Sequence, residues 1–111
     1  MRIHTDPNGL YVNAMFTSNE KDVEGHQYVI VAGVKSTLLD FQQGAIKEAG
    51  LNGITNESLL DVIIHRMNYL NKRFPCIENE NAIKCLNDAL SHLNARTSQR
   101  ISRGVEGKEL A

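Results

Sequence analysis

Three arginines near the C-terminus have the spacing of one helix face. Arg96, Arg100 and Arg103 follow at i, i+4 and i+7, so on a helix they lie within about 60° of one another. No carboxylate between Asp88 and Glu106 offsets their mutual repulsion. Guanidinium groups bind phosphate and carboxylate through charge-assisted hydrogen bonds, so this spacing predicts a face that binds either an anionic ligand or an anionic partner chain. A solvated basic helix end, stabilised by the helix dipole, is the alternative interpretation.

A second arginine stripe, earlier in the chain, contains an aromatic residue. Arg66, Tyr69 and Arg73 follow at i, i+3 and i+7. A tyrosine between arginines can stack on a base while the guanidiniums bind phosphate. Asn79 comes shortly after, and its amide can both donate to and accept from a base edge or a ribose hydroxyl. The alternatives are ordinary amphipathic packing for the stripe and helix capping for Asn79.

Distance limits how these two groups can act together. Asn79 and Arg96 are 17 residues apart, which on one helix corresponds to roughly 25 Å. A compact ligand cannot contact both in one chain. If both serve one ligand, two chains packed head to tail would bring the Tyr69–Asn79 end of one chain to the arginine end of the other. A two-fold axis would then create two equal sites at the interface.

Patterns typical of catalysis or metal binding are absent from the sequence. None of the four histidines is paired with a Ser, Cys or carboxylate in a recognisable triad pattern. The two cysteines, Cys76 and Cys85, form neither a C-x-x-C pair nor a cluster with zinc spacing. There is no G-x-G-x-x-G motif and no P-loop. We therefore expect no catalytic residue, no metal site and no cofactor.

The first half of the chain must supply strands. Residues 10–17 alternate between apolar and polar side chains, and residues 26–34 are rich in β-branched side chains. A third strand is expected over residues 38–43, after a short turn at 35–37. The connections are too short for parallel crossovers, so an antiparallel β-meander is predicted. Glycines at 44, 50 and 53 mark a loop that leads to the next element.

The second half must supply two helices. The first is expected to begin at an N-cap at Thr55 or Asn56 and to end before Pro75. The second is expected from about residues 76–78 to Ser102, with Gly104 ending it. Apolar side chains recur at helical spacing in both segments. They are Leu59, Ile63, Met67, Leu70 and Phe74 in the first segment, and Ala82, Ile83, Leu86, Ala89, Leu90, Leu93, Thr97 and Ile101 in the second.

These elements predict an α+β fold, with an N-terminal antiparallel β-meander followed by a long antiparallel two-helix hairpin. The expected regions are residues 1–52 for the sheet and residues 53–111 for the hairpin, which would bind the ligand and drive oligomerisation. Two helices alone bury little apolar surface, so the sheet or helices of another chain must cover the remaining stripe. We therefore expect an oligomer.

The net charge and the lack of long apolar runs limit the classes of partner that we expect. The 111 residues carry a net charge of −1, which favours neither nucleic acid nor a membrane surface as a partner of the whole molecule. The N-terminus has no apolar signal segment, and no run approaches the length of a transmembrane helix. We therefore expect a soluble protein of a reducing cytoplasm.

The C-terminal half resembles a known family. It contains the run Cys76-Ile-Glu-Asn-Glu-Asn-Ala82 and the ending R-T-x-x-R-x-x-R-G-V-E-G over residues 96–107. Over about residues 53–107 these motifs are similar to the helical-hairpin domain of phage immune-evasion sponges, which comprise the Thoeris anti-defence and anti-CBASS groups. The strand-rich extension before the hairpin resembles the first Thoeris anti-defence type, because the anti-CBASS relatives are mostly helical and shorter.

The resemblance implies a non-catalytic protein that captures cyclic ADP-ribose isomers (glycocyclic ADP-ribose) made by bacterial TIR-domain enzymes. Its partners would be that ligand and copies of itself, as a dimer or hexamer, in the cytoplasm of the infected host. The implied ligand-binding residues are Tyr69, Asn79, Arg96 and Arg100, and the two stripes add Arg73 and Arg103. The alternatives are a sponge for cyclic di- or trinucleotides only, an additional site for cyclic oligonucleotides, and a nucleic-acid or structural module.

Overall fold

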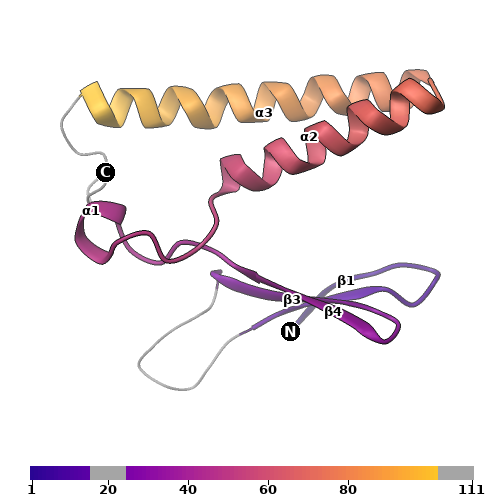
Figure 1. Ribbon diagram of the computed structural model, residues 1–111, viewed down its shortest axis with the longest axis horizontal. Coiled ribbons are helices and arrows are strands. Elements are labelled where there is room, and N and C mark those ends of the chain that lie inside the picture. The colour runs from indigo at the N-terminus through magenta and orange to yellow at the C-terminus, as the bar shows by residue number, and fades with distance from the viewer. Residues whose placement is uncertain (16–24, 103–111) are drawn as a thin grey trace. The chain divides into compact units, whose positions relative to one another are not determined.

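The computed structural model describes residues 1–15 and 25–102 and has an α+β fold (Figure 1). Within these residues, four strands precede three helices, which agrees with the predicted fold class. The chain divides into two compact units. Met1–Gln43 and Leu51–Ile54 form the sheet unit, while Gly44–Gly50 and the chain from Thr55 onward form the helical unit.

The sheet is an antiparallel meander with the strand order β1-β2-β3-β4. Its strands are β1 (Arg2–Thr5), β2 (Tyr11–Ala14), β3 (Gln27–Ala32) and β4 (Lys35–Asp40). The predicted meander is confirmed, but β1 was not expected. Its four exposed residues carry no apolar alternation, and β1 is held by pairing with β2. Residue positions 16 and 17 of the predicted first strand lie outside the described residues.

The predicted turn at residues 35–37 is wrong. Gly33 has a positive φ of 66°, which lets Gly33 and Val34 close a two-residue hairpin, so Ala32 pairs directly with Lys35. As a consequence, β4 begins at Lys35 and ends at Asp40, three residues earlier than the strand expected over 38–43. The sequence signal was present in Gly33, but the run of β-branched residues around it masked the turn.

Two backbone hydrogen bonds close the segment that links the sheet to the helices, and we call this pair of bonds the clasp. The Gln42 N–H donates to the Ile54 carbonyl at 2.8 Å, and the Ile54 N–H donates to the Asp40 carbonyl at 2.9 Å. The Asn52 amide accepts from the Gln43 N–H and donates to the Gln43 carbonyl. The loop predicted from its glycines therefore has ordered ends, and it contains one short helix, α1 (Ile46–Ala49).

Gly53 is required by this clasp. A Cβ at Gly53 would lie 2.5 Å from the Asp40 carbonyl oxygen and 2.5 Å from the Phe41 carbonyl carbon. We expect Gly53→Ala to lower the free energy of unfolding by about 1–3 kcal/mol, because the clasp must shift to admit the methyl group. The melting temperature in thermal unfolding at fixed protein concentration measures this loss of stability. Gly33→Asn is the control, because no atom lies within 4 Å of that position and Asn tolerates positive φ. Equal melting temperatures for the two variants would contradict the steric explanation.

Two long helices make up most of the helical unit. Helix α2 (Asn56–Arg73) begins at the predicted N-cap Thr55, whose hydroxyl accepts from the Ser58 N–H, while the Ser58 hydroxyl accepts from the Thr55 N–H. This reciprocal pair forms a capping box. The helix ends at Arg73, with Phe74 as its C-cap before Pro75. Helix α3 (Ile77–Ser102) follows at once, as predicted, and Gly104 lies outside the described residues.

On the packed face of α3, half-buried residues recur at alternating intervals of four and three residues. Its half-buried residues are Asn79, Ile83, Leu86, Leu90, Leu93, Thr97 and Arg100. This is the spacing of a coiled-coil seam. The expected stripe is confirmed at Ile83, Leu86, Leu90, Leu93 and Thr97, whereas Ala82, Ala89 and Ile101 are exposed. On α2 the expected Ile63 and Phe74 are also exposed, because the half-buried residues Leu60, Ile64 and Met67 keep the four–three spacing there.

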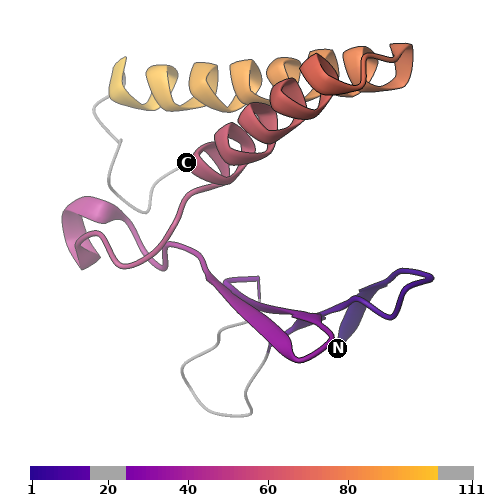
Figure 2. The same cartoon turned by 45° about the vertical axis from the view of Figure 1, so that its right-hand side comes forward.

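The two helices lie side by side near their turn and diverge away from it, as both views show (Figures 1 and 2). Helix α3 has 26 residues and α2 has 18, so α3 is longer by roughly 12 Å. Its C-terminal turns, which carry Arg96 and Arg100, therefore extend beyond the start of α2. No side chain in the described ranges 1–15 and 25–102 is fully buried, so a single copy has no closed apolar core there.

Candidate ligand-binding site

One candidate group of residues lies at the turn of the hairpin. We call Tyr69, Arg73, Phe74 and Asn79 the tip cluster. The Arg73 Nη1 atom donates to the Tyr69 hydroxyl at 3.0 Å. The Arg73 guanidinium carbon lies 5.9 Å from the Tyr69 ring centroid and 5.6 Å from that of Phe74. The structure thus joins Tyr69 and Arg73, as their spacing predicted, and adds Phe74, which sequence reasoning treated as an apolar packing residue.

Hydrogen bonds at the turn hold the tip cluster in position. The Asn71 side-chain carbonyl accepts from the Cys76 N–H at 3.1 Å, which ties the last turn of α2 to the start of α3. The Asn79 N–H donates to the Cys76 sulfur at 3.4 Å, so Cys76 caps α3. The Asn79 side-chain amide donates to the Phe74 carbonyl at 3.4 Å. Asn79 is therefore not the capping residue of α3.

The second candidate group lies toward the other end of α3. Arg96 is exposed, whereas Arg100, four residues later, is half-buried on the seam. Arg103, the third predicted arginine, lies outside the described residues. The sequence separation of Asn79 and Arg96 on the continuous helix α3 corresponds to roughly 25 Å. One chain therefore does not bring the arginines to the tip cluster.

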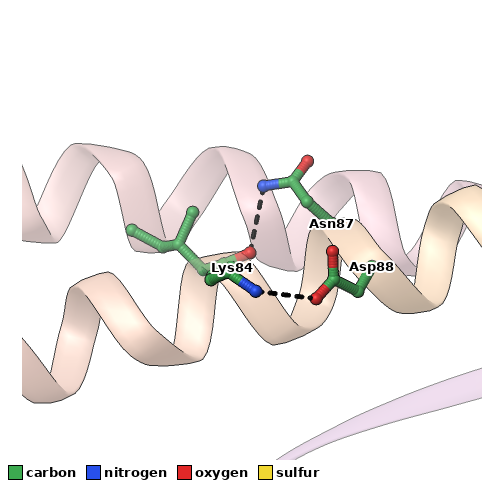
Figure 3. Close-up of polar contacts among 4 residues, drawn as sticks. Lys84, Asn87 and Asp88 are labelled. Carbon is green, nitrogen blue, oxygen red and sulfur yellow. Dashed lines mark hydrogen bonds and ion pairs between the residues drawn. The ribbon is translucent and has the colours of Figure 1, made fainter.

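On the outer face of α3, one cation and one anion pair with each other. Lys84 forms an ion pair with Asp88 one turn later at 3.3 Å, and both side chains are largely exposed (Figure 3). The neighbouring Asn87 amide donates to the Ile83 carbonyl at 3.0 Å. This surface pair contributes at most a few tenths of a kcal/mol. Arg96 lies on a different face, in a stretch of sequence without carboxylates, so it is better suited to bind an external anion.

Across residues 1–15 and 25–102, no three His, Cys, Asp or Glu side chains come together in a way that could hold a metal ion. Both Cys76 and Cys85 are free and exposed. In the described part of the chain, no helix is long and apolar enough to cross a membrane.

Comparison with known proteins places the chain in a family. No family model matches the chain. A curated protein of Bacillus phage SBSphiJ7, named Thoeris anti-defense 1, is 46% identical to it over 74 residues, which cover 66% of this chain and 52% of the relative. The chain belongs to the Thoeris anti-defence family. It spans about half the length of this curated relative.

In this Thoeris anti-defence chain, the predicted site residues fall into two separated groups. Tyr69, Arg73 and Asn79 share the tip of the hairpin, and Arg96 and Arg100 share the last turns of α3. Phe74 and Asn71 were missed by sequence reasoning. The signal for Phe74 was its place directly before Pro75, although its helical spacing had assigned it to the apolar stripe of the first helix. Asn71 carried no signal, because its contact with Cys76 depends on how the turn folds.

Proposed function

We propose that this chain captures a cyclic ADP-ribose isomer, the signal of Thoeris defence, and holds it without cleaving it. Family membership supports action against Thoeris, since the phage relative carries that name. The two groups of side chains support an anionic ligand with a base: guanidiniums for a diphosphate, an aromatic ring for the adenine and an amide for hydrogen bonding. The proposal assigns Tyr69, Asn79, Arg96 and Arg100 to direct ligand contact, with Arg73 and Arg103 beside them.

The observation that carries the proposal is the separation of the two groups along α3. A single cyclic dinucleotide-sized ligand cannot span roughly 25 Å, so a complete site needs two chains. Two hairpins packed head to tail would meet this need, because each tip cluster then faces the arginine end of its partner. The exposed apolar side chains Val62, Ile63 and Ile101 and the lack of a fully buried side chain in the described ranges support such pairing. We propose a dimer or a hexamer built on this pairing.

The energetics are adequate for stoichiometric capture. Two arginines that bind a partly desolvated diphosphate supply a few kcal/mol of charge-assisted hydrogen bonding. Stacking of adenine on Tyr69 adds about 1–3 kcal/mol. A cleft preformed by the oligomer lowers the cost of ordering these side chains. Binding of this strength would keep the free signal in the host cytoplasm below the level that activates the effector.

The test uses a product mixture made by a TIR-domain enzyme. The full chain is incubated with the mixture, separated by filtration and heated, and the released molecules are identified by mass spectrometry. We expect an intact cyclic ADP-ribose isomer. Release of linear ADP-ribose would show cleavage and would contradict the proposal. Calorimetry with cyclic di- and trinucleotides, run beside the cyclic ADP-ribose isomers, would show whether the cargo is instead a cyclic oligonucleotide.

A further inference from the structure

Phe74 is a large apolar side chain that the fold leaves outside. It is the C-cap of α2, lies between Arg73 and Pro75, and is 68% exposed. Single exposed apolar side chains are common on protein surfaces. Phe74 differs because a second aromatic side chain, Tyr69, is 52% exposed in the same cluster, and one guanidinium contacts both rings.

The contacts of Arg73 orient this aromatic pair. Its guanidinium carbon lies 5.6 Å from the Phe74 centroid and 5.9 Å from the Tyr69 centroid, within the range of cation–π attraction. One of its nitrogens also donates to the Tyr69 hydroxyl. These contacts with two rings restrict the guanidinium, and a guanidinium has further N–H groups that can bind an anion.

The backbone of Phe74 is tied to the proposed ligand site. Its carbonyl accepts from the Asn79 side-chain amide, so the residue that carries the ring and a proposed ligand contact are held together. Pro75 further restricts the conformation of Phe74. The backbone that carries the ring is thus held at the turn beside Asn79.

We propose that Phe74 is a second aromatic contact for the ligand: the purine base packs against its exposed ring while Arg73, held beside Phe74 and Tyr69, binds phosphate. This inference rests on the proposed function and names a specificity-determining residue for the same site. It predicts preference for anions that carry a purine over anions without a base, since only a planar base gains from the ring.

The test replaces the ring in two ways. Phe74→Leu keeps an apolar side chain but removes the aromatic face, and we expect the affinity for purified glycocyclic ADP-ribose to fall about 5- to 100-fold by calorimetry. Binding of inorganic pyrophosphate, which has no base, should change little. Phe74→Trp should keep tight binding, and because the chain has no other Trp, quenching of its fluorescence by the ligand reports stacking directly. Val34→Trp, at an exposed hairpin turn of the sheet, is the matched control and should not be quenched.

The outcomes separate this inference from the proposed function. If the unaltered chain does not bind glycocyclic ADP-ribose, the proposed function fails and the role of Phe74 fails with it. If the unaltered chain binds but Phe74→Leu binds equally well, or the Phe74→Trp signal does not respond to saturating ligand, only the inference is overturned. Should Phe74→Leu change the oligomeric state in sedimentation while Phe74→Trp binds ligand without quenching, Phe74 is a contact between subunits and the inference is overturned as well.

Discussion

Replacing Arg96 and Arg100 together by alanine abolishes capture of the cyclic ADP-ribose isomer, while the chain still assembles. Each charge-assisted hydrogen bond to phosphate contributes about 1.5–3 kcal/mol, so loss of both arginines should weaken binding by about 10²- to 10⁴-fold. Arg96 is exposed and Arg100 is half-buried near the end of the seam, and neither belongs to the apolar part of the seam. Calorimetry measures the affinity, and sedimentation measures the assembly.

A matched control removes a cation from another face of the same helix. Lys84→Ala deletes one exposed charge and its ion pair with Asp88, and it should leave affinity within about twofold, because surface pairs contribute little. The arginine assignment is contradicted if the double variant binds at the affinity of the unaltered chain. If the double variant no longer assembles, the two single variants decide between a ligand contact and a subunit contact.

Mixing two inactive variants restores part of the binding if each site is shared between two chains. The first variant carries Tyr69→Ala and Asn79→Ala, and the second carries Arg96→Ala and Arg100→Ala. In a two-fold pair of unlike chains, one site receives both sets of substitutions and the other receives none. Random pairing of equal amounts should therefore recover about a quarter of the original number of sites, each with the original affinity. Titration calorimetry after co-refolding gives the number of sites.

The control for mixing uses two variants damaged in the same group, Arg96→Ala and Arg100→Ala on separate chains. Every shared site then takes its arginines from a chain that lacks one of them, so mixing should restore nothing. A site built within one chain would likewise remain inactive in the first mixture. If mass spectrometry shows that unlike chains have assembled in the first mixture and the number of recovered binding sites is still near zero, the shared site is contradicted.

The helical half of the chain could be predicted because its signals are local. Thr55 satisfies an N-terminal backbone N–H of α2, Pro75 cannot continue the helix, and apolar side chains recur every three to four residues. Alternation and short connections likewise indicated an antiparallel meander. The spacing of the arginines and of Tyr69 with Arg73 also follows from helix geometry alone, which is why both groups were found before the fold was known.

Other features depended on contacts that form only in the folded chain. Strand β1 exists through its pairing with β2, and Gly53 is needed because the Asp40–Phe41 backbone passes close to it. The seam, rather than the simple helical stripe, decides that Phe74 lies outside and that Arg100 is half-buried. Asn71, Cys76 and Asn79 meet only once the turn has formed. Residue types and local periodicity thus determined which groups can bind an anion and a base, and helix geometry alone set Asn79 and Arg96 roughly 25 Å apart. The tertiary structure decided how the turn places Phe74 beside Asn79, because the hydrogen bonds among Asn71, Cys76, Phe74 and Asn79 form only when the two helices meet.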